Sequence, residues 1–158
     1  MKEVITTIVF LRWNDEILLA MKKRGHGAGH WNGAGGKIEP GETIEQAMVR
    51  ECQEEIGITP SVYEKVAVHS FYEPHGAEQS KLVAHAFICT EWRGEPIETE
   101  EMAPRWFAIK DIPYDTMWPD DRDWLPLVLA GKKLVGAFHY DDQNTLQSHN
   151  VTEVMELP

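Results

Sequence analysis

The stretch from Gly36 to Ile58, with the sequence GKIEPGETIEQAMVRECQEEIGI, constrains the fold more than any other part of the chain. Thr43 is followed three residues later by Gln46, which is the pattern of a helix capping box, and Gly57 is typical of a helix stop. The pattern predicts a helix of about four turns from Thr43 to Ile56.

Three glutamates of this helix lie at unusual positions. At about 100° per residue, Glu51, Glu54 and Glu55 overlap in angle with the apolar stripe, which consists of Ile44, Ala47, Met48, Cys52 and Ile56. Like charges about 6 Å apart repel by roughly 3 kcal/mol at an effective dielectric of about 20, and the helix C-terminus favours cations. Mg²⁺ would remove this conflict, because it is usually held by carboxylates together with substrate phosphates. The alternative is a solvated acidic face.

The same stretch carries a family signature. Its spacing resembles that of the Nudix (MutT-like) hydrolases at Gly36, Glu42, Arg50, Glu51, Glu54, Glu55 and Gly57. The resemblance implies an α/β (α+β) Nudix fold, in which a mixed β-sheet is sandwiched between helices, and a single Nudix hydrolase domain over residues 1–158. It also implies a pyrophosphohydrolase that uses Mg²⁺, with Mn²⁺ as a substitute.

The resemblance implies a metal site and a catalytic set. The positions that hold the metal in the family match Gly36, through its backbone carbonyl, and the side chains of Glu51, Glu54 and Glu55. Arg50 is expected to hold these carboxylates by bidentate pairing, and the alternative is a surface ion pair of under about 1 kcal/mol. Glu101 matches a glutamate that approaches the metals in relatives. Glu55 and Glu101 are both candidates for the general base, and for Glu101 a solvated acid is the alternative.

A second cluster suggests a purine pocket. The segments MKKRGHGAGHWNGAGGK, EMAPRWF and MWPDDRDWLPL are similar to those of a Nudix subfamily that cleaves oxidised purine nucleoside triphosphates. Trp118, Asp120 and Asp121 offer a flat apolar surface and two polar groups within four residues. Two adjacent carboxyls that face one ligand tend to share a proton, so the pair can both donate and accept a hydrogen bond. The alternative is an Asp-rich turn that caps the helix near Trp124.

Further pocket residues follow from the same resemblance: Thr7, Lys22, His26, Asn32, Phe71, Leu82 and Trp124. Asn32 carries both a donor and an acceptor, as base recognition requires. His26 stands where relatives have phenylalanine, and a histidine can stack, hydrogen-bond or titrate near neutrality. The alternative for Phe71 and Leu82 is that they are ordinary residues of the sheet core. The alternative for Lys22 is a solvated lysine at the end of a strand.

The rest of the chain predicts strands and one short helix. The predicted strands are Val4–Trp13, Ile17–Lys23, Ser61–Glu73, Lys81–Thr90, Arg105–Ile109, Leu134–Tyr140 and Thr145–Met155. Asn14-Asp15 predicts a hairpin, and Pro74-His75-Gly76 predicts a turn. A helix from about Arg122 to Ala130 should follow a loop rich in proline and aspartate. The stretch from Gly25 to Gly36 is expected to be a loop that approaches a ligand closely.

Composition restricts the partners. The net charge of −11 and the lack of a basic run argue against DNA or RNA as a partner, whereas small nucleotides carried by Mg²⁺ remain compatible. Cys52 and Cys89 lack metal-ligand spacing and are expected to be reduced core residues. There is no signal-peptide pattern and no apolar run of about 18 residues, so we expect a cytoplasmic protein without a membrane partner, and a monomer.

These patterns lead to one hypothesis and two alternatives. The hypothesis is a Mg²⁺-dependent pyrophosphohydrolase that converts oxidised purine nucleoside triphosphates, such as 8-oxo-dGTP and 2-hydroxy-dATP, to monophosphate and pyrophosphate, and so cleans the nucleotide pool. The first alternative is a Nudix hydrolase of another nucleotide, such as a methylated purine, an ordinary dNTP or a dinucleotide polyphosphate. The second is a nucleotide-binding module without catalysis.

Overall fold

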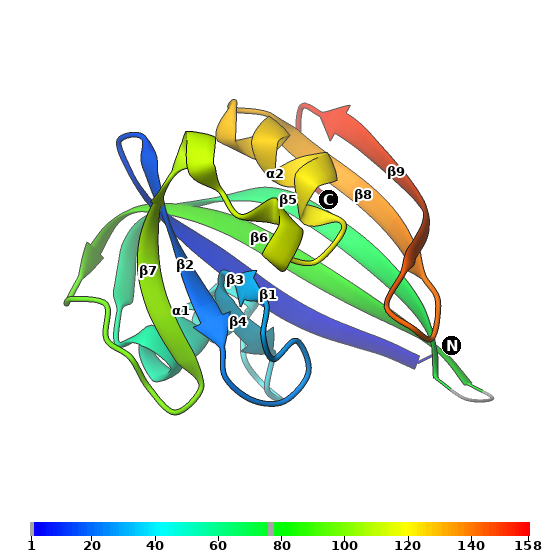
Figure 1. The fold of residues 1–158 in the computed structure, drawn as a ribbon, viewed down its shortest axis with the longest axis horizontal. Helices are drawn as coiled ribbons and strands as arrows, with labels where there is room; N and C mark the ends of the chain where they lie inside the picture. Colours follow the sequence, from blue (N-terminus) through cyan, green and yellow to red (C-terminus); the bar gives the residue numbers. More distant parts are fainter. Residues whose placement is uncertain (1, 76–77) are drawn as a thin grey trace.

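A mixed β-sheet organises the computed structural model, which describes residues 2–75 and 78–158. Its strand order is β3-β2-β1-β6-β5-β8-β9, with β4 paired to β1 and β7 to β2 (Figure 1). The strands are β1 Lys2–Trp13, β2 Glu16–Lys22, β3 Trp31–Asn32, β4 Ala34–Lys37, β5 Thr59–His75, β6 Glu78–Arg93, β7 Met102–Ala108, β8 Lys133–Tyr140 and β9 Leu146–Val154. The helices are α1 Ile44–Ile56 and α2 Asp121–Leu129.

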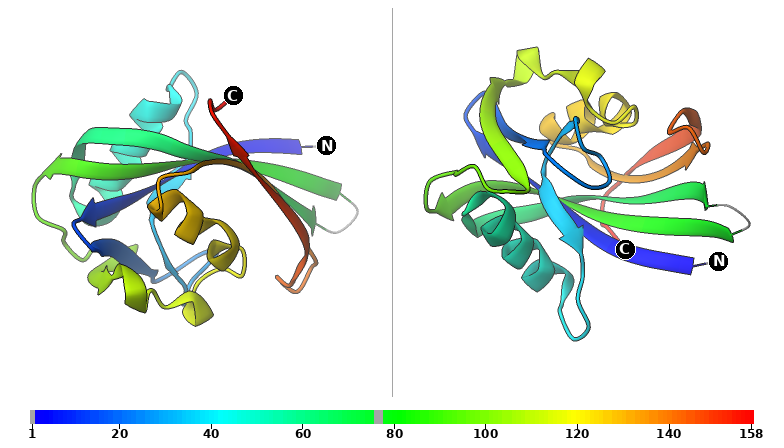
Figure 2. Two further views of the ribbon diagram at one scale, coloured as in Figure 1. Left: turned by 90° about the horizontal axis from the view of Figure 1, so that it is seen from above. Right: turned by 60° about the horizontal axis from the view of Figure 1, so that its bottom comes forward.

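The two helices pack on opposite faces of the sheet, as Figure 2 shows. Consecutive residues of β1 alternate between two hydrophobic clusters, because successive side chains of a strand point to opposite faces. Val9 and Leu11 join the cluster that contains Met48 and Cys52 of α1. Phe10 joins the other cluster, which contains Trp124, Leu125 and Val128 of α2. The prediction of a mixed sheet sandwiched between helices is therefore confirmed.

Helix α1 begins and ends as its sequence predicts. Gln46 N–H donates to Thr43 Oγ1 at 3.1 Å, and Thr43 N–H donates to Gln46 Oε1 at 3.0 Å, which together form the capping box. Gly57 ends the helix with φ of 73°, a left-handed conformation that favours glycine. Cys52, in the middle of the helix, and Cys89 of β6 are both free and buried.

Several predicted boundaries differ from the structure. Strands β5 and β6 are longer than predicted. They pair antiparallel along their length, and this pairing extends both strands past the residues whose sequence pattern is typical of a strand. Pro74 and His75 belong to β5, while Gly76 of the predicted turn lies outside the described residues. Ile109 begins a 3₁₀ turn (Ile109–Asp111) and does not extend β7, and a second such turn covers Tyr114–Thr116.

The glycine-rich stretch is more regular than a loop. It contains β3 and most of β4, and β4 pairs antiparallel with β1. A Cβ at Gly35 would lie 1.8 Å from the Thr7 carbonyl oxygen, so only glycine allows the two strands to approach this closely. This contact positions the chain that enters α1 over the sheet. Among the described residues, no helix is long and apolar enough to span a bilayer.

We predict that Thr43→Ala lowers the free energy of unfolding by about 1 kcal/mol, because the backbone N–H of Gln46 loses its acceptor. Urea denaturation of the purified protein measures this change. Thr43→Ser keeps the hydroxyl and is the matched control, which should stay within a few tenths of a kcal/mol of the wild type. Equal stability of Thr43→Ala and Thr43→Ser would show that the capping box does not stabilise the helix.

Candidate active site

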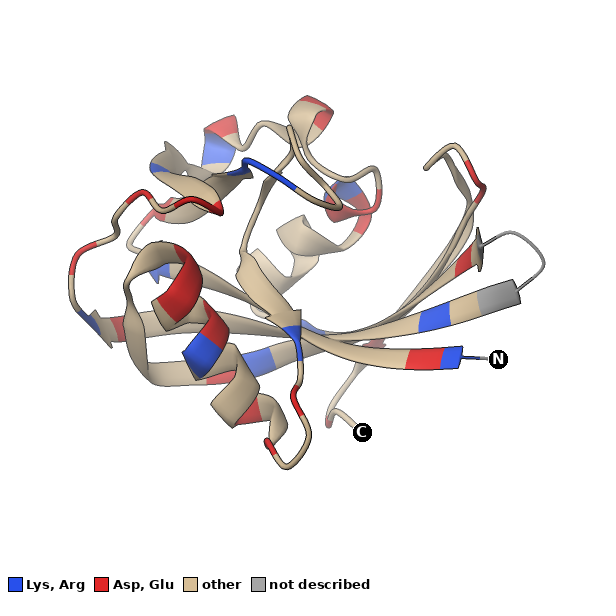
Figure 3. Cartoon of the chain, turned by 90° about the horizontal axis from the view of Figure 1, so that it is seen from below, with Lys and Arg blue, Asp and Glu red and all other residues tan. Residues whose placement is uncertain are grey.

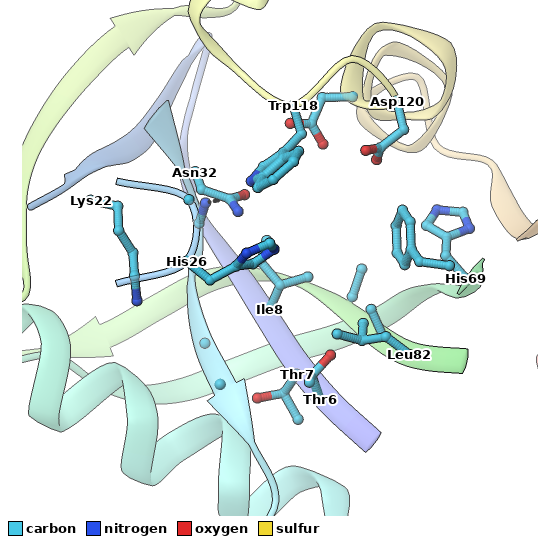
Figure 4. Close-up of a pocket in the computed structure, with 18 of the residues that line it drawn as sticks. Thr6, Thr7, Ile8, Lys22, His26, Asn32, His69, Leu82, Trp118 and Asp120 are labelled. Atoms are coloured by element: carbon cyan, nitrogen blue, oxygen red, sulfur yellow. Dashed lines mark hydrogen bonds between the residues drawn. The ribbon is translucent and has the colours of Figure 1, made fainter. Parts of the chain in front are cut away.

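A cavity of about 240 Å³ lies where β1, β4, β5 and β6 meet the chain that leads into α2 (Figure 4). All of the predicted substrate-binding residues line it: Thr7, Lys22, His26, Asn32, Phe71, Leu82, Trp118, Asp120, Asp121 and Trp124. Gly36 and Glu55 also line it, so the cavity connects the helix with the acidic signature to the predicted base pocket. Their roles in binding and catalysis remain predictions.

Glu55 is the buried acid of helix α1. Only 6% of it is exposed, and the backbone N–H of Gly35 lies 3.4 Å from its Oε2. Burial raises the pKa of Glu55 to about 8; the positive charge of Lys22 acts against this, and the nearby carboxylate of Glu51 adds to it. A Cβ at Gly36 would lie 2.7 Å from the Glu51 carboxyl group, so glycine lets Glu51 lie directly against the β4 backbone.

Arg50 organises the remaining acids of α1. Its Nε and Nη2 donate to the two carboxylate oxygens of Glu42, at 2.7 and 2.9 Å, in a bidentate pair. Its Nη1 donates single hydrogen bonds to Glu51 at 3.0 Å and to Glu54 at 3.2 Å. The bidentate partner is therefore Glu42, which sequence reasoning did not identify. Arg50 is more than a surface ion pair, because only 22% of its side chain is exposed and it donates hydrogen bonds to Glu42, Glu51, Glu54 and the Lys37 carbonyl.

The donor set of this region fits a hard divalent cation. Oxygen ligands are available from the Gly36 backbone and from Glu51 and Glu55, and the carboxylate of Glu51 is close enough to raise the pKa of Glu55. The side chain of Glu54 is 59% exposed and lies on the same helix. Within residues 2–75 and 78–158 no three His, Cys, Asp or Glu side chains are already gathered into a metal-binding group. A cation would supply the positive charge that this arrangement lacks.

Glu101 lies outside the cavity lining and has a different partner. Its Oε1 accepts hydrogen bonds from Nε and Nη2 of Arg24, at 3.0 and 2.6 Å, and this pairing lowers the pKa of Glu101. Lys23 pairs with Glu98 beside it. Figure 3 shows the acidic residues of α1 and the acidic segment before β7 on the same side of the molecule. Glu101 thus lies on the same side of the molecule as the acids of α1, but its carboxylate is paired with Arg24.

The base end of the cavity contains two buried aspartates. Asp120 and Asp121 are 4% and 3% exposed. Trp124 Nε1 donates to Asp120 Oδ2 at 2.8 Å, and the Tyr140 hydroxyl donates to Asp120 Oδ1. Asp120 occupies the N-cap position of α2, but its side chain makes no capping hydrogen bond there. Burial raises the pKa of both carboxyls, and the charge of Asp120 raises that of Asp121 further, so the pair retains a proton above the ordinary carboxyl range.

Aromatic rings form the flat part of the cavity. Trp118 stacks with His26 at a centroid distance of 5.1 Å and with His30 at 4.8 Å, so His26 does stack as its sequence position suggests. His30 was not predicted, although it occupies the next position of the same Gly/Ala-rich stretch where a ring could stack. Asn32 Oδ1 accepts the N–H of Gly33 at 2.9 Å, which fixes the side chain at the cavity wall.

Sequence reasoning also missed Tyr140 and His69, which both line the cavity. No local signal marks them, because both belong to ordinary strands. In the described part of the chain, buried atoms without a hydrogen-bond partner include Thr7 Oγ1, Asp121 Oδ2 and both ring nitrogens of His69. Buried polar atoms are nearly always paired, so unpaired ones on a cavity wall favour a polar ligand.

Comparisons with known proteins give one consistent result. A family model described as NUDIX domain matches residues 1–128. The oxidized purine nucleoside triphosphate hydrolase of Mus musculus is 44% identical over 148 residues, which cover 94% of both chains. The protein of that name from Danio rerio is 41% identical over 153 residues, which cover 97% of both. The crystal structure of a mutator MutT protein from Bacillus halodurans matches with a TM-score of 0.84 and 28% identity, covering 94% of this chain and 97% of that one.

We predict that Arg50→Lys lowers the free energy of unfolding by about 1–2 kcal/mol, because a lysine ammonium cannot reproduce the bidentate pair with Glu42. Urea denaturation measures the loss. Arg122→Lys is the matched control, since the exposed Arg122 pairs with the exposed Asp115, and loss of this pair should cost under about 0.5 kcal/mol. The same small effect at both positions would show that Arg50 does not organise the acids of α1.

Proposed function

The chain belongs to the Nudix family, and we propose that it is a Mg²⁺-dependent pyrophosphohydrolase of oxidised purine nucleoside triphosphates. The observation that carries this proposal is the joining, in one cavity, of the buried pair Asp120 and Asp121 with Glu55 and the Gly36 backbone. A purine nucleotide needs hydrogen-bonding groups for its base and a charged site for its phosphates. The names of the mouse and zebrafish relatives support the same substrate class.

The two aspartates differ in what they can offer a base. Both oxygens of Asp120 accept hydrogen bonds from the protein, whereas Asp121 Oδ2 has no partner among the described residues. Asp121 is therefore the carboxyl that meets the ligand: it donates when it holds the shared proton and accepts when it does not. These two states match the edges of an oxidised guanine and an oxidised adenine. Trp118 supplies the flat surface beside them.

At the phosphate end, the proposed metal site consists of the Gly36 carbonyl, Glu51, Glu54 and Glu55, with Glu101 as a further ligand once it leaves Arg24. These residues would hold Mg²⁺, or Mn²⁺ in its place, and the cation would supply positive charge to the phosphoryl oxygens and to the leaving pyrophosphate. Glu55 and Glu101 are the two candidates to take a proton from the attacking water. Lys22 lines the cavity and offers a positive charge to the phosphates.

We propose that residues 1–158 form one Nudix hydrolase domain, which acts as a monomer in the cytoplasm. Its substrates are free nucleotides, because a net charge of −11 repels a polyanion that no metal ion neutralises. The products are a nucleoside monophosphate and pyrophosphate. Removal of oxidised purines from the nucleotide pool is the role that follows.

The test is pyrophosphate release with Mg²⁺ from 8-oxo-dGTP, 2-hydroxy-dATP, O6-methyl-dGTP and dGTP, compared as kcat/KM. We expect the oxidised purines to exceed dGTP by tenfold or more, since one or two hydrogen bonds to the base are worth about 1–3 kcal/mol. A preference for the methylated purine, or equal rates for all four, would assign a different nucleotide to this Nudix hydrolase. Nucleotide binding without any pyrophosphate release would indicate a non-catalytic module.

We predict that Glu54→Gln lowers kcat on the order of 100-fold or more, while the free energy of unfolding stays within about 0.5 kcal/mol of the wild type. Glu54 is largely exposed and accepts one hydrogen bond, from Arg50, so its charge has little packing to lose. Steady-state kinetics and urea denaturation measure the two effects. Glu45→Gln, at an exposed position in the first turn of α1, is the control and should retain activity. Joint loss of stability and activity in Glu54→Gln would refute a role in metal binding.

A further inference from the structure

His69 is a buried polar side chain that has no role in the proposed mechanism. It lies in β5, is 1% exposed and lines the cavity. Neither ring nitrogen has a hydrogen-bond partner among the described residues. Figure 4 shows it at the same end of the cavity as Asp120.

The position of the ring is fixed by its neighbours. Its centroid lies 4.6 Å from that of Trp124 and 5.2 Å from that of Phe138, in edge-on contacts. Gly136 of β8 is directly opposite His69 in the sheet, and a Cβ there would lie 2.4 Å from Nδ1 and 2.9 Å from Cε1. The Nδ1 edge therefore rests on the β8 backbone, and Nε2 is the ring nitrogen farther from it.

The chemistry of this environment makes His69 a neutral hydrogen-bonding group. Burial lowers its pKa to about 3, so near neutral pH the ring has one N–H donor and one acceptor nitrogen. A buried polar group without a partner costs about 1–3 kcal/mol, and an apolar side chain would pack against Trp124 and Phe138 without that cost. A partner that the bound substrate supplies would compensate it.

We propose that His69 is a specificity-determining residue whose Nε2 hydrogen-bonds the base of the bound purine nucleotide. This inference rests on the proposed function, and it adds an imidazole to the pair of carboxyls at the base end of the cavity. Trp124 connects the two groups, because its ring packs against His69 and its Nε1 donates to Asp120. The purine edge is then contacted from two sides of the cavity.

The chain provides a matched control in His85. This histidine also has an unpaired buried nitrogen, and burial also lowers its pKa. His69 pairs with Ala84 across β5 and β6, and His85 pairs with Val68, so the two imidazoles occupy successive positions that point to opposite faces of the sheet. Ala84 lines the cavity, whereas His85 is absent from its lining.

The experiment compares His69→Leu, His69→Gln and His85→Leu in the full-length protein with Mg²⁺. We expect His69→Leu to lower kcat/KM for 8-oxo-dGTP about tenfold, chiefly through a higher KM. His69→Gln should recover most of this loss, because its amide nitrogen can take the place of Nε2. His85→Leu should match the wild type. Equal kinetics of His69→Leu and His85→Leu, or no recovery in His69→Gln, would overturn the inference.

A measurement on the wild-type protein avoids any folding defect of the variants. In protein labelled with ¹⁵N-histidine, addition of 8-oxo-dGMP should shift the Nε2 resonance of His69 and leave the ring nitrogens of His85 unchanged. An unchanged His69 resonance with bound nucleotide would overturn the inference while the proposed function stands. Absence of both nucleotide binding and pyrophosphate release would overturn both.

Discussion

The burial of Glu55 is the constraint on which the arrangement of the site depends. Helix α1 must pack Met48, Cys52 and Ile56 against the sheet, and Glu55 lies within that packed face. A carboxylate there loses most of its hydration, which is why burial is the main cause of its raised pKa. The surrounding structure compensates only in part, through the Gly35 N–H and the charge of Lys22.

The bounds of α1 follow from the local sequence, but the contacts of the site residues with parts of the chain distant in sequence do not. The capping box and the left-handed Gly57 involve residues a few positions apart, so the bounds of the helix were predicted nearly correctly. The bidentate pair of Arg50 with Glu42 depends on how the preceding loop folds back over the helix. Glu101 meets Arg24 only because β7 pairs with β2, and sequence patterns do not determine such pairings.

The base end shows the same division between local and long-range information. Trp118, Asp120 and Asp121 are adjacent in sequence and were predicted together. Tyr140 reaches Asp120 from the end of β8, and His69 reaches the cavity through the parallel register of β5 with β8. A strand pattern identifies which residues share a face, but which strands become neighbours is set by packing of the whole sheet. Tyr140 and His69 depend on this choice and were missed, whereas Phe71, in the same strand as His69, was predicted from the family resemblance.

Both ends of the cavity place two carboxyls close together, and the surroundings of the two pairs differ. At each end two carboxyls are close together and partly or wholly buried, and burial raises the pKa of Glu55 as it does that of Asp121. Beside Glu55 the chain leaves backbone and carboxylate oxygens without enough cations, which favours a metal ion. Around Asp120 it places two hydrogen-bond donors and an aromatic wall, which favours retention of a proton. A substrate with charged phosphates and a polar base suits both ends at once. Its phosphates bring a metal ion to the carboxylates beside Glu55, and its base hydrogen-bonds the carboxyl pair that retains a proton.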